Sequence, residues 1–346
     1  MIEAPTSAGV CARRAPVARL QLLLLVSFGV LLVLCLLSLV VGTRTVPPGE
    51  VFAALVGRGS PDVEALVWGG RLPRTLLGVL VGLSLGLAGA VMQALTRNPL
   101  GDPGLLGISS GAAFGIVVAV AATGMSSLYG YIWFAFAGAL AASAVVYLLG
   151  SVGRGGATPV KLALAGVAMT ALLTSLTSGI ALLDPGALNR YRFWAAGSLA
   201  GQDSGVVLRV LPFVLAGVLL ALASATALNS MALGDDVAKA LGRRVGLVRT
   251  QGALAITLLT GSAVAVVGPI VFVGLVVPHA ARAVTGPDHR WLLPFSMVLA
   301  PVLVLAADIV GRVIARPGET EVGIVVALIG VPFFIALVRR RRLAEL

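Results

Sequence analysis

The amino-acid sequence predicts an all-α, polytopic membrane protein with about ten transmembrane helices. Hydrophobic residues make up 58% of its 346 residues and charged residues only 11%, whereas a soluble domain carries about 25% charged residues. The charges gather in short clusters between apolar runs of roughly twenty residues, the length that crosses the hydrocarbon core of a bilayer. The net charge of +11 does not indicate nucleic-acid binding, because the basic residues lie beside the ends of the predicted spans.

Ten apolar segments follow one another along the chain. They are residues 20–41, 72–95, 105–123, 129–150, 162–183, 206–228, 250–267, 270–285, 291–313 and 322–338. The first resembles a signal peptide but is too long for one, so we expect a retained span after a cytoplasmic tail, residues 1–19, and a single permease domain over 20–346. Gly268 and Pro269 separate the seventh and eighth segments, which predicts short or broken helices that line a cavity, since irregular backbone cannot face lipid.

The basic residues predict the orientation of the chain in the membrane. When alternate loops are assigned to opposite sides, sixteen of the 25 lysines and arginines fall on one side and nine on the other. The richer side is expected to be cytoplasmic. It holds both termini and the loop 229–249, so both ends of the chain are predicted to lie inside the cell.

Residues 71–100 combine a charged outer end with a broken inner end. Arg71 and Arg74 lie at the start of the second span, where the helix dipole disfavours cations. Either an acidic partner compensates for this placement, or the arginines simply reach into the interface. At the other end Asn98 and Pro99 break the helix, as expected of a movable gate.

A short helix is predicted at residues 234–242, between two glycines. Asp235 and Asp236 fall in its first turn, Lys239 lies inside it, and Arg243 and Arg244 lie at its end, as the helix dipole favours. Val237, Ala238 and Leu241 form a small apolar face. The helix either lies on the membrane surface or docks into a cytoplasmic partner, and the small face favours docking.

The sequence offers little for covalent chemistry. It has no Gly-x-x-x-x-Gly-Lys-Ser/Thr motif, so ATP-driven action would need another subunit. Asp308 and Arg312 are four residues apart in the ninth span, which predicts an ion pair, with a proton relay as the alternative. We expect no metal site from His279 and His289, and no enzymatic activity.

Several motifs together carry a family resemblance from about residue 20 to the end of the chain. They are Arg-Leu-Pro-Arg at 71–74, Gly-Ala-Val-Met-Gln at 89–93, Arg-Asn-Pro-Leu at 97–100, Pro-Gly-Leu-Leu-Gly at 103–107, Ser-Gly-Ala at 110–112, Leu-Gly at 233–234 and again at 241–242, Phe-Val-Gly-Leu-Val-Val-Pro-His at 272–279, Asp-His-Arg at 288–290, Ala-Asp at 307–308, Val-Gly-Ile at 322–324 and Ile-Gly-Val-Pro-Phe at 329–333. With them the chain resembles the FecCD family of ABC-importer permeases. One departure stands before the last span, where the family usually has Glu-Leu-Pro and this chain has Glu319, Thr320 and Glu321.

The resemblance implies a type II ABC importer permease, similar to BtuC, in the cytoplasmic (inner) membrane. It implies a dimer with a second permease copy or a sister permease, cytoplasmic ATPase subunits that use ATP and magnesium, and an extracytoplasmic substrate-binding protein. The chain itself would hold no cofactor. The expected substrate is a ferric siderophore, with cobalamin and haem as alternatives.

The resemblance also implies roles for single residues. Arg71, Arg74 and Arg312 match arginines that pair with glutamates of the binding protein. The ATPase-coupling positions are Leu233, Gly234, Asp235, Ala238, Leu241 and Gly242. The cytoplasmic gate positions are Asn98, Leu100, Thr158 and Pro159, and the fifth span would line the pathway.

Two function classes outside this family remain open at this point. An ion-gradient-driven secondary transporter would carry coupling carboxylates in the middle of the membrane and would need no ATPase. A purely structural membrane subunit is the other.

Overall fold

The computed structural model describes residues 17–42, 44–124, 128–152, 158–202 and 204–339, and within these ranges the chain is helical with no strands. The ten helices in the predicted segments are α1 (Val17–Val40), α4 (Leu72–Thr96), α5 (Ile108–Thr123), α6 (Leu128–Ser151), α7 (Pro159–Leu183), α9 (Ser204–Ala223), α12 (Val245–Val267), α13 (Val273–Thr285), α14 (His289–Ile314) and α15 (Val322–Arg339). The residues of the predicted tail up to 16, and those from 340 onward, lie outside the described ranges.

Seven stretches in the described part of the chain are long and apolar enough to cross a membrane. They contain α1, α4, α6, α7, α9, α12 and α14, and α5, α13 and α15 are shorter apolar helices. The predicted all-α, membrane-spanning fold is therefore confirmed. The sixth segment differs from its prediction, because α9 ends at Ala223 and a separate helix α10 (Ala225–Ala232) follows. Ser224 lies between them, and its hydroxyl donates to the carbonyl oxygens of Leu220 and Ala221, a contact that bends helices.

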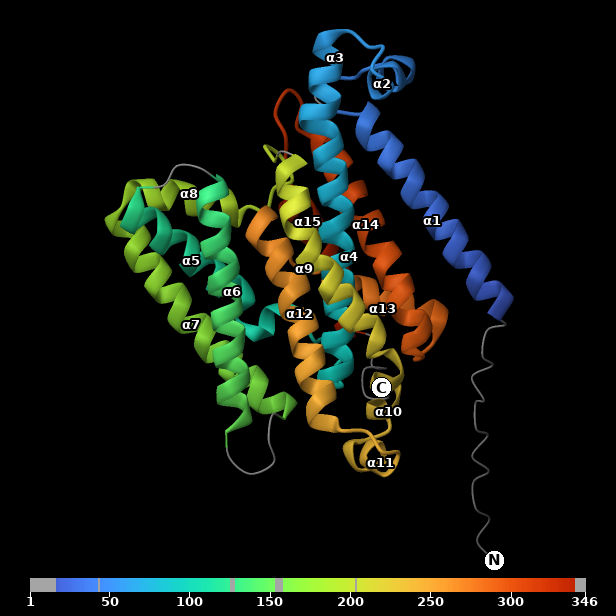
Figure 1. The fold of residues 1–346 in the computed structure, drawn as a ribbon, viewed down its shortest axis with the longest axis vertical. Coiled ribbons are helices and arrows are strands. Elements are labelled where there is room, and N and C mark those ends of the chain that lie inside the picture. The colour runs from blue at the N-terminus through green and yellow to red at the C-terminus, as the bar shows by residue number, and fades with distance from the viewer. Residues whose placement is uncertain (1–16, 43, 125–127, 153–157, 203, 340–346) are drawn as a thin grey trace, which may run out of the picture.

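Short helices that the hydropathy pattern does not predict cover the loops. They are α2 (Pro48–Leu55), α3 (Pro61–Leu66), the π-helical turn η1 (Val67–Arg71), the 3₁₀ turn η2 (Pro103–Leu106), α8 (Pro185–Ala195) and α11 (Asp235–Ala240), of which only α11 is expected from the sequence. Proline at the first helical position begins α2, α3 and α8. In Figure 1, α2, α3 and α8 lie at one end of the bundle and α10 and α11 at the other. We call these the α2–α3 end and the α10–α11 end.

Helix α4 forms the centre of the bundle and contacts α9, α12, α13 and α14. Its glycines make the close approach possible. A Cβ at Gly82 would lie 2.5 Å from the Cα of Pro301, and one at Gly86 would lie 2.6 Å from the carbonyl oxygen of Ser296. Small residues at this contact bring the two backbones together.

The break between α12 and α13 is partly covered by protein, and Pro269 and Val271 line an open groove beside α15. Gly268 and Phe272 have left-handed backbone conformations there. The last carbonyl oxygens of α12 accept hydrogen bonds from outside the helix: the indole of Trp194 donates to Val264 (3.0 Å) and the amide N–H of Ser198 to Val267 (2.8 Å). No lipid-facing irregular backbone is needed, because these contacts satisfy the interrupted ladder.

Candidate docking and coupling sites

Arg71 stabilises the end of α1 at the α2–α3 end. Its guanidinium donates to the carbonyl oxygens of Leu39 (2.6 Å), Val40 (2.8 Å) and Arg44. The last carbonyls of a helix have no partner within it, and a cation is favourable there. Only 6% of Arg71 is exposed, so this residue caps α1 from the neighbouring helix.

Arg312 of α14 also donates hydrogen bonds to carbonyl oxygens at the end of α1. It donates to the carbonyl oxygens of Ser38 (2.9 Å) and Val41 (2.8 Å) and forms an ion pair of 2.8 Å with Asp308. This ion pair between residues four apart confirms the sequence prediction. Both side chains are almost fully buried.

Asp308 also binds Arg74, which the sequence did not predict. The carboxylate accepts from Arg74 at 2.8 Å, and Glu319 holds the same guanidinium at 2.6 Å. Arg74 comes from α4 and Glu319 from the loop before α15, so the contact joins residues that are more than 200 positions apart. The spacing of residues along the sequence does not predict an ion pair between residues so far apart.

We call Arg71, Arg74, Arg312, Asp308 and Glu319 the outer arginine cluster. Three guanidinium groups and two carboxylates leave one excess positive charge. All three arginines donate hydrogen bonds within the chain: Arg74 and Arg312 pair with carboxylates, whereas Arg71 donates to main-chain carbonyl oxygens and carries the excess charge. Their predicted role in docking a binding protein is untested and stays a prediction.

The loop at the α10–α11 end contains the predicted short helix, α11. Gly234 and Gly242 flank it with φ angles of 110° and 77°, which favour glycine. Leu233, Val237 and Leu241, spaced by four, are 65%, 45% and 60% exposed. We call these three residues the α11 apolar face.

Ala238 does not belong to this face, so the prediction that grouped it with Val237 and Leu241 is wrong on this point. The Ala238 side chain is fully buried, because α11 rests on the bundle with that side. Asp235 also lies toward the bundle, where it accepts from Arg249 of α12 at 2.7 Å and from Arg97 at the end of α4. The sequence predicted α11 but not these two contacts.

The predicted gate residues lie in two segments. Asn98 and Leu100 form a compact turn directly after α4, in which the Asn98 side-chain oxygen accepts from the Leu100 N–H at 2.9 Å. Thr158 caps α7, and its hydroxyl accepts from the Lys161 N–H at 3.4 Å. Pro159 begins α7. The gate role itself stays a prediction.

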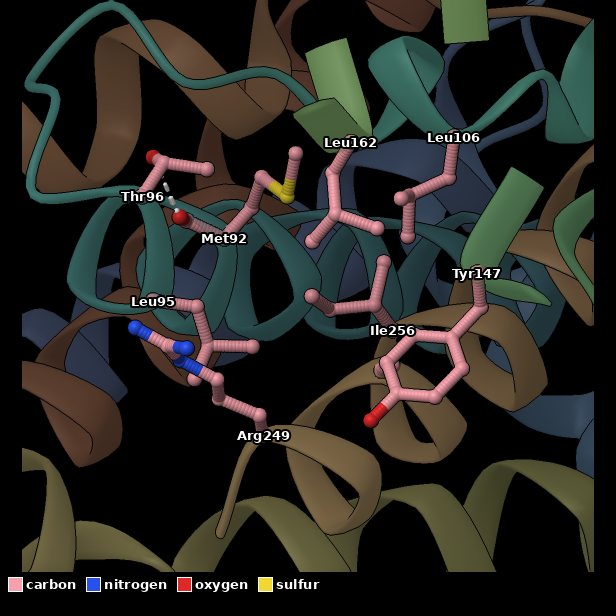
Figure 2. Close-up of a pocket in the computed structure, with 9 residues that line it drawn as sticks. Met92, Leu95, Thr96, Leu106, Tyr147, Leu162, Arg249 and Ile256 are labelled. Atoms are coloured by element: carbon pink, nitrogen blue, oxygen red, sulfur yellow. Dashed lines mark hydrogen bonds between the residues drawn. The ribbon is translucent and has the colours of Figure 1, made fainter. Parts of the chain in front are cut away.

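A small apolar pocket lies among the ends of α4, α6, α7 and α12. Met92, Leu95, Leu162 and Ile256 line it, with Tyr147 and Arg249 at its edge. Figure 2 shows the Arg249 guanidinium beside Leu95, at the last turn of α4. The hydroxyl groups of Tyr147 and Thr250 are 2.7 Å apart and join α6 to α12.

An open groove runs along one side of α7. It is lined by small and hydroxyl-bearing residues, namely Gly104, Gly166, Val167, Thr170, Ala171, Thr174, Ser175 and Ser178. Only 17% of the residues in the apolar spanning window of α7 are buried inside the chain. A second, more apolar groove follows α15 and includes Pro269, Ile324 and Leu328.

The profile of the FecCD transport family matches residues 30–340, which is most of the chain. The chain belongs to this family. It is 51% identical over 317 residues to the ferric enterobactin transport system permease protein FepD of Escherichia coli, covering 90% of this chain and 94% of FepD. It is also 42% identical over 291 residues to the probable siderophore transport system permease protein YfiZ of Bacillus subtilis, covering 84% and 87%.

The fold of this FecCD-family chain is shared with a solved ABC transporter. The structure, described as an inward-facing conformation of a putative metal-chelate type ABC transporter, matches with a TM-score of 0.81 and 30% identity over 92% of this chain and 99% of that one. The chain is therefore a multi-pass membrane permease of the ABC-transport type. Membership of this class implies ATPase and binding-protein partners in general terms.

Proposed function

We propose that the chain is the membrane permease of an ATP-driven importer of ferric siderophores. One observation carries this proposal: the 51% identity to the ferric enterobactin permease FepD, over nearly the full length of both chains. The hemin permease HmuU of Yersinia pestis and the cobalamin permease BtuC of Halobacterium salinarum are each 40% identical. Haem and cobalamin are therefore the second and third candidate substrates.

The translocation pathway is proposed to form between two permease chains, a pair of copies or a copy and a sister permease. The groove on α7 supports this arrangement, because it presents the hydroxyl groups of Thr170, Thr174 and Ser178 on a weakly buried helix. Polar groups that face lipid are costly. A water-filled pathway shared with the second permease would remove that cost.

The ATPase subunits are proposed to dock at the α10–α11 end. The α11 apolar face supports this, because three exposed apolar side chains, Val237 in α11 and Leu233 and Leu241 beside it, gain from burial in a partner. The chain itself has no P-loop, so ATP and magnesium belong to the ATPase, and the permease is neither catalytic nor bound to a cofactor. This end and both termini then face the cytoplasm.

The binding protein is proposed to dock at the α2–α3 end. The excess positive charge of the outer arginine cluster supports an acidic partner, and carboxylates on the two lobes of the binding protein would compete with Glu319 for Arg74. ATP-driven closure would then move α11 and open or close the gate at Asn98, Leu100, Thr158 and Pro159.

The structure gives the ion-gradient alternative little support. A gradient-driven transporter needs a carboxylate that can gain and lose a proton or sodium ion along the pathway. Asp308 lies inside a spanning helix, but two arginines hold it at 2.8 Å each. It acts as a structural anion in this arrangement.

A transport experiment tests the proposed substrate. The chain is reconstituted in liposomes with its ATPase and binding protein, once alone and once with a sister permease, and uptake of ferric enterobactin, haem and cobalamin is compared. We expect uptake of the ferric siderophore at least ten times faster than that of the other two. Uptake of haem or cobalamin alone would contradict the proposal.

A further inference from the structure

We infer that Asp235 links α11 mechanically to the gate turn, through ion pairs with Arg97 and Arg249. We call these three residues the Asp235 bridge. The inference rests on the proposed function and deepens it, because it names the residues that would pass motion from the ATPase side to the gate. All three are proposed as positioning residues, since none contacts a substrate.

The bridge uses both oxygens of one carboxylate. Oδ2 of Asp235 lies 2.7 Å from Nη2 of Arg249, and Oδ1 pairs with Nη2 of Arg97. The side chains of Arg249, Asp235 and Arg97 are 15%, 30% and 39% exposed. Charge-assisted hydrogen bonds are directional and stronger than neutral ones. The carboxylate therefore orients both arginines relative to α11, with the Arg249 pair part-buried and the Arg97 pair at the surface.

Arg97 transmits this contact to the gate turn. It ends α4 in a left-handed conformation, with φ 48° and ψ 35°, where glycine is the usual residue. The next residues fold as a unit, because the Asn98 carbonyl accepts from the Gly101 N–H at 2.9 Å and its side chain accepts from the Leu100 N–H. A displacement of Arg97 therefore moves the whole turn.

The turn leads on to the groove proposed as the pathway. The η2 turn starts two residues after Gly101, and its Gly104 lines the α7 groove beside Thr170. Contacts thus run without a gap from α11 through the Asp235 bridge and the gate turn to the groove. These contacts give a motion of α11 a route to the gate turn, and the measurements below test whether the motion follows it.

Arg249 provides the fixed side of the bridge. Arg249 belongs to α12, and 72% of the residues in the spanning window of α12 are buried inside the chain. The Arg249 guanidinium lies beside Leu95 of α4 (Figure 2). The adjacent Thr250 is joined to Tyr147 of α6. Asp235 therefore connects α11 to two central helices of the bundle.

A simpler explanation is that Asp235 only stabilises the start of α11. Acidic residues in the first turn of a helix interact favourably with its dipole. Asp236 occupies the same turn, is 99% exposed at its side chain and pairs only within α11, with Lys239 at 3.3 Å. It supplies the dipole effect without a bridge, and so it is a matched control.

The first test measures coupling in the reconstituted complex with ATPase and binding protein. In both Asp235→Ala and Arg97→Ala we expect uptake reduced about tenfold or more. In Arg97→Ala, which leaves every residue of α11 in place, ATP hydrolysis should stay within about twofold of wild type. The double variant should be no worse than Asp235→Ala, because that single change already removes the contact with Arg97. Arg97→Lys should recover most of the uptake, and Asp236→Ala should match wild type.

The second test reads the bridge without transport. Hydrogen exchange is followed in the purified permease at the amides of Asn98, Leu100 and Gly101. Asp235→Ala should speed exchange there at least fivefold, whereas Asp236→Ala should not. Unchanged exchange, or additive losses in the double variant, would overturn the bridge. Failure of the wild-type complex to transport would overturn the proposed function instead, and the exchange result would still decide the bridge.

Discussion

Asp308 shows what a buried charge requires at the level of a single residue. Its side chain is 1% exposed and both of its oxygens are held by arginines, Arg74 and Arg312. Removing a charge from water is costly unless its partners and hydrogen bonds are complete. The position therefore tolerates its charge only as part of the outer arginine cluster.

The first prediction concerns this carboxylate. Asp308→Asn leaves the buried Arg312 guanidinium without its anion and Arg74 with Glu319 alone, and is expected to lower the free energy of unfolding by about 3–5 kcal/mol. Glu319→Gln is the matched control, because it removes a partly exposed partner of the same Arg74 and should cost less than about 1 kcal/mol. Unfolding of the purified chain in detergent measures both. Equal losses of unfolding free energy in the two variants would show that the burial of the carboxylate does not decide how much its removal costs.

At the scale of elements, α4 and α14 cross closely because glycine lies at the contact. Gly78, Gly82 and Gly86 are spaced by four and all face α14. Hydrophobic attraction between helices is weak in lipid, so van der Waals contact between close backbones holds them together. The added methyl of an alanine cannot fit where backbone atoms already fill the space.

The second prediction compares two glycines in spanning helices. Gly82→Ala is expected to destabilise the chain by about 1–3 kcal/mol through overpacking against Pro301. Gly179→Ala in α7 meets no atom within 4 Å, and its better helix propensity should leave stability unchanged or raised by up to about 1 kcal/mol. Thermal unfolding midpoints in detergent distinguish the two, and a loss at both positions would argue against the close-packing account.

The third prediction concerns the α11 apolar face. Leu241→Asp places a charge on the surface proposed to enter the ATPase and should weaken association at least tenfold, because an unpaired charge is costly to bury. Leu241→Met keeps an apolar side chain of similar volume and should bind as wild type does. Co-purification of the ATPase measures association. Full binding by the aspartate variant would place the ATPase elsewhere.

The sequence predicted the elements better than the contacts between them. Apolar length indicated the ten helices, and the two glycines around residues 234–242 indicated α11, since both signals are local. The α9–α10 break escaped because a serine inside an apolar run carries no strong breaking signal. The Arg74–Glu319 and Arg97–Asp235 pairs escaped because distant residues meet only when the helices pack.

At the scale of the whole molecule, the two ends of the bundle differ in chemistry. The α2–α3 end carries paired arginines with one excess positive charge, and the α10–α11 end carries an exposed apolar helix fixed by ion pairs. Between them lies the glycine-packed core around α4. This arrangement fits a permease that receives an acidic binding protein at one end and an ATPase at the other.

The most direct measurement of this account is uptake of ferric enterobactin into liposomes that contain the complete complex. Our account predicts uptake with ATP supplied to the ATPase, and none when the ATPase carries an inactivating substitution, even under an imposed proton or sodium gradient. Uptake that follows the gradient and survives loss of ATP hydrolysis would contradict it.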